Sequence, residues 1–300
     1  MNLELRQLRY FVTVAEELHF GRAALRLHMT QPPLSQAIAA FEDGLGAPLF
    51  VRNRRTVELT PAGHALLPEA RRLLLEAAAL PALVRRAALG QTGRLALAFV
   101  TSADYSLLPP FLRRYGERYP GVHLRLQEAT SDVQIEELLA GRIDAGLLIP
   151  PLPDKAQAEL DYMKVLEEPL VLCAPSGLLA HAGAGGDARV RLQDLPHLPL
   201  IIFPREVSPG LHDAILSCFH AAGLAPAIGQ EAIQMQTIVS LVSAGMGLAL
   251  VPQSVCNLMR PGVEYRALAD PTPLVETGIA WRRDNPSPVL RGFLELLRTT

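Results

Sequence analysis

The sequence predicts a winged helix–turn–helix at the N-terminus, a long helix after it, and an α/β region in the rest of the chain. Three observations support this order. Residues 20–45 read as two short helices around a tight turn, and an arginine-rich hairpin follows them. Residues 61–89 carry apolar residues at steps of three and four, which is typical of a helix. Beyond a short hinge, strand-like and helix-like runs alternate, as they do in α/β domains.

Length and composition fit a folded protein with more than one domain. The chain has 300 residues, of which 49% are hydrophobic and 19% are charged. Its net charge of −2 hides an asymmetry between its two parts. Residues 1–90 carry 11 Lys and Arg against 8 Asp and Glu, whereas the remainder carries 17 against 22. The resulting net charges of +3 and −5 favour DNA binding by the N-terminal part, although the difference is modest.

The first predicted helix covers residues 5–18. Its apolar residues share one face: Leu8, Phe11, Val12, Ala15 and Leu18. A helix with this pattern can cover the two helices that follow it.

The second helix of the helix–turn–helix is predicted to begin at Thr30, whose hydroxyl can cap free N–H groups. Pro32 and Pro33 fall in its first turn, where a missing N–H costs no internal hydrogen bond. An apolar stripe follows at Leu34, Ile38, Phe41 and Leu45, and Pro32, Gln36 and Ala39 lie opposite it with Ser35 on the flank. Amide and hydroxyl side chains can exchange hydrogen bonds with base edges. The alternative is a solvated helix in an all-α cap.

The hairpin after residue 46 consists of two strand-like runs around Asn53. Arg52, Arg54 and Arg55 lie at its tip. Arginine suits contacts with phosphates or with the minor groove, so this hairpin resembles the wing of a winged helix–turn–helix.

The long helix is predicted to start with Thr60 as cap and Pro61 at its first position. A heptad seam runs along it: Leu66, Ala70, Leu73, Ala77, Leu80, Val84 and Ala87. Such a seam can pair with the same helix of a second subunit, or it can pack on its own domain. Pro68 and Pro81 each remove an internal hydrogen bond, so we expect bends there.

Strands are predicted at residues 94–99, 122–128 and 143–149, with helices at 106–119 and 133–140 between them. This alternation implies a mainly parallel sheet with helices on both faces. A turn-rich stretch at 150–159 interrupts it. A second series follows, with strands at 170–174, 200–203, 227–231 and 247–251 and helices at 210–222 and 235–244. A last strand at 276–281 and a last helix at 289–298 belong to neither series by position, and they could pack back against the first one.

In open α/β sheets a ligand binds outside the carboxyl ends of the strands, where helix N-termini present N–H groups. Three places qualify: Thr101 with Ser102, Thr130 with Ser131, and Phe203-Pro204-Arg205. The hydroxyls can hold a carboxylate while Phe203 packs on an apolar or aromatic body. The alternative is ordinary helix capping by Ser and Thr, and Arg205 can equally be a solvated or salt-bridged surface residue.

The sequence offers little support for catalysis, for a bound metal or for a membrane segment. It contains no GxSxG, HExxH or phosphate-loop lysine motif. Cys173, Cys218 and Cys256 are far apart, which favours buried packing in a reducing compartment. There is no signal-peptide core and no apolar run long enough to span a bilayer, so we expect a cytoplasmic protein that is not an enzyme and has no cofactor.

Four spaced motifs make a resemblance specific. They are Leu-Arg-Gln-Leu-Arg-Tyr-Phe-Val-Thr-Val-Ala-Glu-Glu at 5–17, Thr-Gln-Pro-Pro-Leu-Ser-Gln-Ala-Ile at 30–38, Gly-Ala-Pro-Leu-Phe-Val-Arg at 46–52 and Val-Glu-Leu-Thr-Pro-Ala-Gly at 57–63. In this order they resemble a LysR-type transcriptional regulator. One departure concerns Ala39 and Ala40, where members of the family often carry Arg or Lys. Phosphate contacts should therefore depend on the wing and the helix ends.

The resemblance implies a two-lobed effector domain like that of periplasmic binding proteins. It implies a DNA-binding domain at 1–60, a linker and dimerisation helix at 61–90, and an effector domain at 91–300. Lobe I of that domain would comprise residues 91–163 and 269–300, and lobe II residues 164–268.

The resemblance also implies partners: double-stranded operator DNA, a small-molecule effector, RNA polymerase, and further copies of the chain in a dimer or a tetramer. The expected DNA-binding residues are Arg22, Thr30, Gln31, Pro32, Ser35, Gln36, Arg52, Arg54 and Arg55. The expected dimerisation residues are Leu66, Leu73, Leu80 and Val84.

For the effector, the resemblance points to a pocket between the lobes. The expected residues are Thr101, Ser102, Thr130, Ser131, Phe203, Pro204 and Arg205. Phe-Pro-Arg followed by Pro209-Gly210 is similar to regulators of aromatic-compound breakdown, which suggests an aromatic carboxylate or its breakdown product. Two other functions stay open at this point: a cytoplasmic solute-binding module whose N-terminal helices only dimerise, and an α/β enzyme acting on organic acids.

Overall fold

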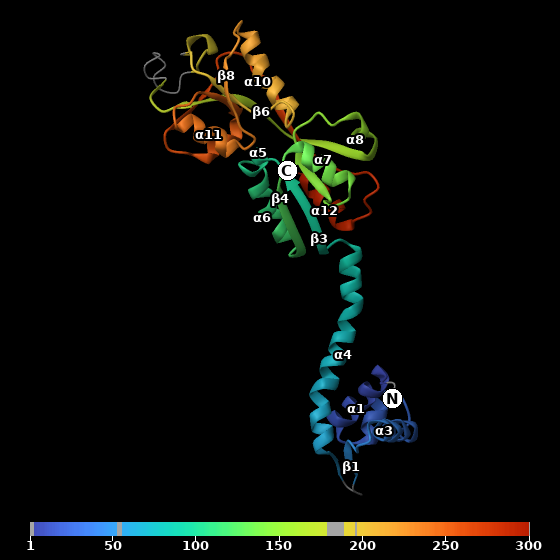
Figure 1. Ribbon diagram of the computed structural model, residues 1–300. Helices are drawn as coiled ribbons and strands as arrows, with labels where there is room; N and C mark the ends of the chain where they lie inside the picture. The colour runs from blue at the N-terminus through green and yellow to red at the C-terminus, as the bar shows by residue number, and fades with distance from the viewer. Residues whose placement is uncertain (1–2, 53–55, 179–188, 196, 300) are drawn as a thin grey trace. The chain divides into compact units, whose positions relative to one another are not determined.

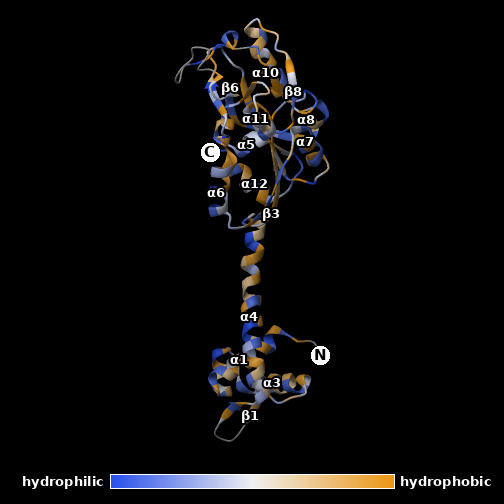
Figure 2. Cartoon of the chain, turned by 60° about the vertical axis from the view of Figure 1, so that its left-hand side comes forward, coloured by the Kyte–Doolittle hydropathy of each residue, from blue (hydrophilic) through white to orange (hydrophobic). Residues whose placement is uncertain are grey.

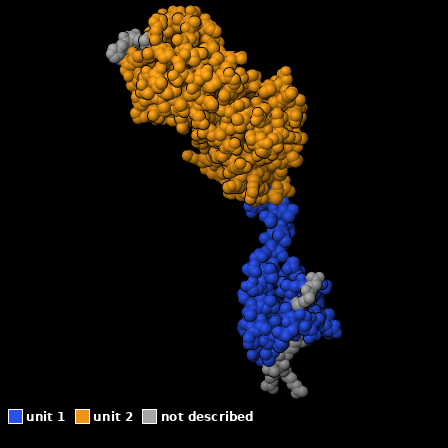
Figure 3. All heavy atoms as spheres, in the orientation of Figure 1, with its two compact units in different colours: residues 1–86 blue, residues 87–300 orange. Residues whose placement is uncertain are grey.

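The computed structural model describes residues 3–52, 56–178, 189–195 and 197–299. The chain forms two compact units, Met1–Arg86 and Ala87–Thr300 (Figure 3). Among the described residues, no helix is long and apolar enough to cross a membrane.

The first unit contains three helices, a two-stranded wing and most of a fourth, long helix (Figure 1). The helices are α1 (Leu5–Glu17), α2 (Phe20–Arg26) and α3 (Gln31–Leu45). The predicted apolar faces meet in one core, because Leu8 and Phe11 of α1 and Leu34 and Phe41 of α3 are all fully buried. The predicted helix–turn–helix is thus confirmed.

Three details of this unit differ from the prediction. Thr30 is the N-cap of α3, but its side chain makes no capping hydrogen bond. Leu18 lies at the C-cap of α1, and its side chain is exposed there because the helix has ended. Leu45 is also partly exposed, since it lies in the last turn of α3, beyond the edge of the core.

The wing consists of β1 (Phe50–Arg52) and β2 (Val57–Leu59), which pair antiparallel as predicted. The carboxylate of Glu42 in α3 anchors its start, because Oε1 accepts the N–H groups of Leu49 at 2.7 Å and of Phe50 at 3.0 Å. Helix α3 and the wing are therefore connected directly, through a side chain on one and the backbone of the other.

Helix α4 (Pro61–Ala88) begins as the sequence predicts. The Thr60 hydroxyl accepts the N–H of Gly63 at 3.0 Å, and the helix continues through Pro68 and Pro81. Its apolar residues are visible along α4 in Figure 2 and divide into two groups. Leu66, Leu67, Leu73 and Leu74 are partly buried against the core of the first unit, whereas Leu80, Leu83 and Val84 are exposed.

Lobe I of the second unit is a sheet with helices on both faces. Strand β3 (Thr92–Phe99) pairs in parallel with β4 (Gly121–Glu128) and β5 (Ala145–Leu148), and β11 (Leu274–Arg282) runs antiparallel to β5. Its helices are α5 (Thr101–Asp104), α6 (Leu108–Arg118), α7 (Ser131–Leu139), α8 (Asp154–Glu159) and α12 (Pro288–Leu297). One core joins α6 and α12 to the sheet through Phe111 and Phe293, and a second joins α7 through Leu138.

Strand β6 (Leu160–Pro175) carries the chain from lobe I into lobe II. It pairs with β11 up to Pro169, and from Leu170 onward with β9 (Ala249–Pro252) and with β10 (Val263–Ala267). Lobe II also contains β7 (Leu200–Ile202), β8 (Ile228–Glu231), α10 (Pro209–Ala221), α11 (Met235–Ser243) and two 3₁₀ helices, η1 (Leu192–Asp194) and η2 (Gln253–Leu258). The two-lobed architecture with a crossing strand is therefore confirmed.

The prediction is wrong at four points of this unit. The sheet is mixed rather than mainly parallel, because β6 and β11 run antiparallel to their neighbours. Strand β6 starts at Leu160 instead of residue 170, and β10 was not predicted. The turn-rich stretch at 150–159 contains α8. Residues 101–119 form two helices, α5 and α6, instead of the single helix predicted over 106–119.

Polar and backbone contacts join the lobes beside β6. The amide of Asn257 in η2 donates to the backbone oxygen of Tyr105 at 2.8 Å, which connects lobe II to the segment after α5. Gly210 in the first turn of α10 packs against the backbone of Pro150, leaving no space for a Cβ. These contacts position the first turns of α5 and α10 on opposite sides of one pocket.

Candidate effector pocket and DNA-reading surface

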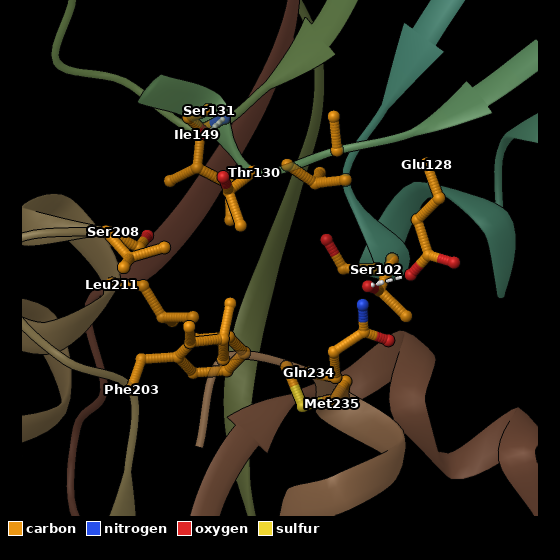
Figure 4. A pocket seen from close by; sticks show the side chains of 15 residues that line it. Ser102, Glu128, Thr130, Ser131, Ile149, Phe203, Ser208, Leu211, Gln234 and Met235 are labelled. Atoms are coloured by element: carbon orange, nitrogen blue, oxygen red, sulfur yellow. Dashed lines mark hydrogen bonds between the residues drawn. The ribbon is translucent and has the colours of Figure 1, made fainter. Parts of the chain in front are cut away.

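A pocket opens between the lobes of the second unit (Figure 4). Its lining comes from the ends of β3, β4 and β5 in lobe I and from the segments before and within α10 and α11 in lobe II. The lining residues are Val100, Thr101, Ser102, Glu128, Ala129, Thr130, Ser131, Ile149, Phe203, Val207, Ser208, Leu211, Ile233, Gln234 and Met235. The structure thus brings together five of the seven residues that the sequence nominates for the effector: Thr101, Ser102, Thr130, Ser131 and Phe203.

The hydroxyls of Ser131 and Ser102 differ in their hydrogen bonding. Ser131 Oγ accepts the N–H of Ile149 at 3.1 Å and so ties α7 to the end of β5. Ser102 is 4% exposed, and its hydroxyl has no hydrogen-bond partner among the described residues. Figure 4 shows this hydroxyl pointing into the space in front of Thr130. A buried hydroxyl without a partner carries a desolvation cost, which a polar ligand atom in the pocket would remove.

Several helices begin at this pocket. Thr130, Ser208 and Gln234 are the N-caps of α7, α10 and α11, and none of their side chains makes a capping hydrogen bond. The first N–H groups of a helix have no partner inside the helix, and the helix dipole adds positive potential there. The pocket therefore presents unsatisfied N–H groups from both lobes, which is the arrangement that binds anions.

Two of these N-caps were not nominated from the sequence. Ser208 precedes Pro209, and Ser followed by Pro is a helix-start signal that identifies it in retrospect. Gln234 has no such signal, because glutamine is an uncommon N-cap.

Apolar side chains form the rest of the lining. Phe203 and Leu211 are buried and belong to lobe II, whereas Val100 and Ile149 come from lobe I. A pocket with this lining and a few convergent polar groups fits a small ligand with an apolar body.

The charges around the pocket are acidic. Glu128 is exposed at its edge, where Oε1 accepts the hydroxyl of Thr101 at 2.5 Å. Among the described residues that line the pocket, none is a Lys, an Arg or a His. Any positive potential inside it therefore comes from helix ends and not from a charged side chain.

Pro204 and Arg205 do not line the pocket. Arg205 instead forms a bidentate ion pair with Asp213 of α10, with distances of 2.8 and 2.9 Å. The guanidinium lowers the pKa of Asp213 to about 2. The structure therefore supports the surface ion pair over a contact between Arg205 and a ligand carboxylate.

On the first unit, the predicted DNA-reading residues share the N-terminal half of α3. Thr30, Gln31, Pro32 and Gln36 are exposed, and Ser35 is half-exposed beside them. Arg22 is exposed on α2, and its guanidinium bonds the backbone oxygen of Glu17 and forms an ion pair with its carboxylate at 3.4 Å. The side chain of Arg52 and the whole of Arg54 and Arg55 lie outside the described residues.

The described part of the chain contains neither a reactive cysteine pair nor a metal-binding cluster. Cys173 and Cys218 are buried as predicted, and burial raises their pKa values to about 12 and about 11, so neither thiol is a thiolate near neutral pH. Cys256 is half-buried. The described residues include no group of three or more His, Cys, Asp or Glu that is placed to hold a metal ion.

Comparison with known proteins matches both units. Residues 5–64 match the model of the bacterial regulatory helix-turn-helix protein, lysR family, and residues 88–300 match the LysR substrate binding domain. The transcriptional regulator IlvR of Caulobacter vibrioides is 50% identical over 295 residues, which cover 98% of this chain and 97% of the relative. The regulator AlsR of Bacillus subtilis is 40% identical, over 98% of this chain and 95% of the relative.

Among solved structures, the LysR family transcriptional regulator CbnR is similar over 99% of this chain and 100% of its own, with a TM-score of 0.83 and 32% identity. Full-length CbnR with its target DNA is similar over 99% of both chains, with the same score and identity. The curated relatives are transcriptional regulators rather than enzymes. The chain belongs to the LysR family and is a DNA-binding transcriptional regulator with an effector-binding domain.

Proposed function

We propose that this regulator binds its operator with the N-terminal half of α3 and the wing, and that a small organic acid in the pocket between the lobes controls it. An aromatic carboxylate or a product of its breakdown is the first candidate for that acid. The similarity to CbnR supports the DNA part, since CbnR was solved with its target DNA. The pocket supports the effector part.

One observation carries the effector proposal. The N-termini of α7, α10 and α11 and the unpartnered hydroxyl of Ser102 meet at one apolar pocket. Backbone N–H groups and hydroxyls are donors that suit a carboxylate, and the side chains around Phe203 suit its apolar body.

The assembly is part of the same proposal. Residues 1–60 would bind DNA, 61–90 would link and pair subunits, and 91–300 would bind the effector, within a homodimer or homotetramer acting with RNA polymerase in the cytoplasm. Exposed Leu80 and Val84 support pairing through the second half of α4, since apolar side chains there have no cover within the first unit. An effector that binds the lobes in one arrangement would shift the population of assemblies that fit the promoter.

We expect Gln36→Ala to weaken operator binding by about 1–3 kcal/mol, because an amide that pairs with a base edge is lost. Binding to random DNA should be nearly unchanged. Fluorescence anisotropy with operator and scrambled duplexes measures both, and Gln230→Ala on exposed β8 is the matched control. Equal losses on both duplexes would show that α3 does not read bases through this residue.

We expect Ser102→Ala to weaken binding of benzoate, used as the aromatic carboxylate probe, by about tenfold, because a hydrogen bond to a charged group contributes about 1.5–3 kcal/mol. Calorimetric titration of the full chain measures the change. Ser217→Ala is the control, since its hydroxyl bonds the backbone of its own helix at the surface. Unchanged benzoate affinity in Ser102→Ala would move the carboxylate away from this hydroxyl.

A further inference from the structure

The charge balance of the pocket is unusual for a site that takes an anion alone. Glu128 is a carboxylate in the lining, and the lining offers no Lys, Arg or His among its described residues. Arg205, the arginine that the sequence nominated for the pocket, lies outside the lining and is held by Asp213. A negative group placed next to Glu128 would meet a like charge, whereas an ammonium group placed there would meet an opposite one.

Glu128 is exposed at the edge of the pocket, and a hydrogen bond holds its carboxylate there. The hydroxyl of Thr101 donates to Glu128 Oε1, which fixes the carboxylate beside the start of α5. A carboxylate accepts about four hydrogen bonds, so this one retains capacity for further donors. Ser102 follows Thr101 in the sequence, and its hydroxyl points into the pocket (Figure 4).

The lining of the pocket thus contains both an acceptor, the Glu128 carboxylate, and a set of donors around Thr130. Glu128 and Thr130 are two residues apart, so their Cα atoms are within about 7 Å of each other. Thr130 is the N-cap of α7, whose first N–H groups form the anion-binding end of the pocket. Ser102, Glu128 and Thr130 all line this one pocket.

We propose that the effector is a zwitterionic amino acid with an apolar side chain, whose ammonium group binds Glu128 while its carboxylate binds Ser102 and the start of α7. This inference depends on the proposed effector function of the pocket and specifies the class of acid. The apolar side chain packs against Phe203 and Leu211 of lobe II. Because the charged end contacts lobe I and the apolar end lobe II, such a ligand bridges the lobes.

The test compares L-leucine with 4-methylpentanoate, which is the same molecule without its amino group. Calorimetric titration of the full chain should show L-leucine binding at least about tenfold more tightly, since charge-assisted hydrogen bonds are the stronger class. Equal or tighter binding of 4-methylpentanoate overturns the ammonium contact. Binding of benzoate without binding of L-leucine overturns this inference and leaves the proposed function standing, whereas binding of none of the three at millimolar concentration contradicts both.

Two variants assign the preference to one carboxylate. Glu128→Gln should lose the preference for L-leucine over 4-methylpentanoate, because the amide keeps the shape and removes the charge. Glu136→Gln, the same change at an exposed position of α7 outside the lining, should keep it. If Glu128→Gln still prefers L-leucine over 4-methylpentanoate, the ammonium group does not bind the Glu128 carboxylate.

Discussion

Phe41→Ala is expected to lower the free energy of unfolding of the first unit by about 3–5 kcal/mol and to remove operator binding with it. Phe41 is fully buried, and its ring meets that of Phe11 edge-on with centroids 6.4 Å apart. It therefore joins α3 to α1 at the centre of a small core, where a cavity cannot be filled by rearrangement elsewhere. The loss is comparable to the total stability of many small domains.

Hydrogen exchange of the α1–α3 amides in the full chain measures this effect without separating the units. Protection should fall in α1–α3 and stay unchanged in the second unit. Leu45→Ala is the matched control, because Leu45 continues the same stripe but is partly exposed. Full protection in Phe41→Ala would mean that the core of the first unit does not depend on this ring.

Leu80→Glu is expected to dissociate the assembly and to lower operator affinity by about 10²–10⁴-fold, the gain that two linked binding heads ordinarily provide. Leu80 is exposed on α4 and lies on the heptad seam that the sequence predicts. Leu73, on the same seam, is a poorer test because it also packs against the core of its own unit. A charge there would change folding and pairing together.

Light scattering and DNA binding on the same sample separate the outcomes. Leu75→Glu is the control, since Leu75 is exposed on α4 but lies off the seam. An unchanged mass for Leu80→Glu would contradict pairing through this seam. A reduced mass for Leu75→Glu alone would move the interface to another face of α4.

The elements of the first unit were predictable because helical periodicity and caps are local signals. Leu34, Ile38 and Phe41 mark a buried face by spacing alone. The second unit was harder, because strand direction is decided by partners far along the chain. The first half of β6 mixes charged and apolar residues without strict alternation, and its pairing with β11 more than a hundred residues later is not visible in either segment.

The pocket was predictable in lobe I and only partly in lobe II. Thr101 and Thr130 directly follow strands, so the rule for α/β sheets finds them. Gln234 lines the pocket as the N-cap of α11, which residue type does not indicate. Arg205 was misleading, since Asp213 lies just over one turn into α10 and only the fold brings its carboxylate within reach.

The bond network of Glu42 has a thermodynamic consequence for DNA recognition. One carboxylate on α3 holds the backbone at the start of the wing, so the hairpin is already joined to α3, the helix that we propose reads bases. Two independently moving elements would each lose conformational entropy on docking, at about 0.5–1.5 kcal/mol for every side chain immobilised. In this chain much of that ordering is complete before DNA arrives, and the hydrogen bonds that secure it lie in the folded protein rather than at the interface.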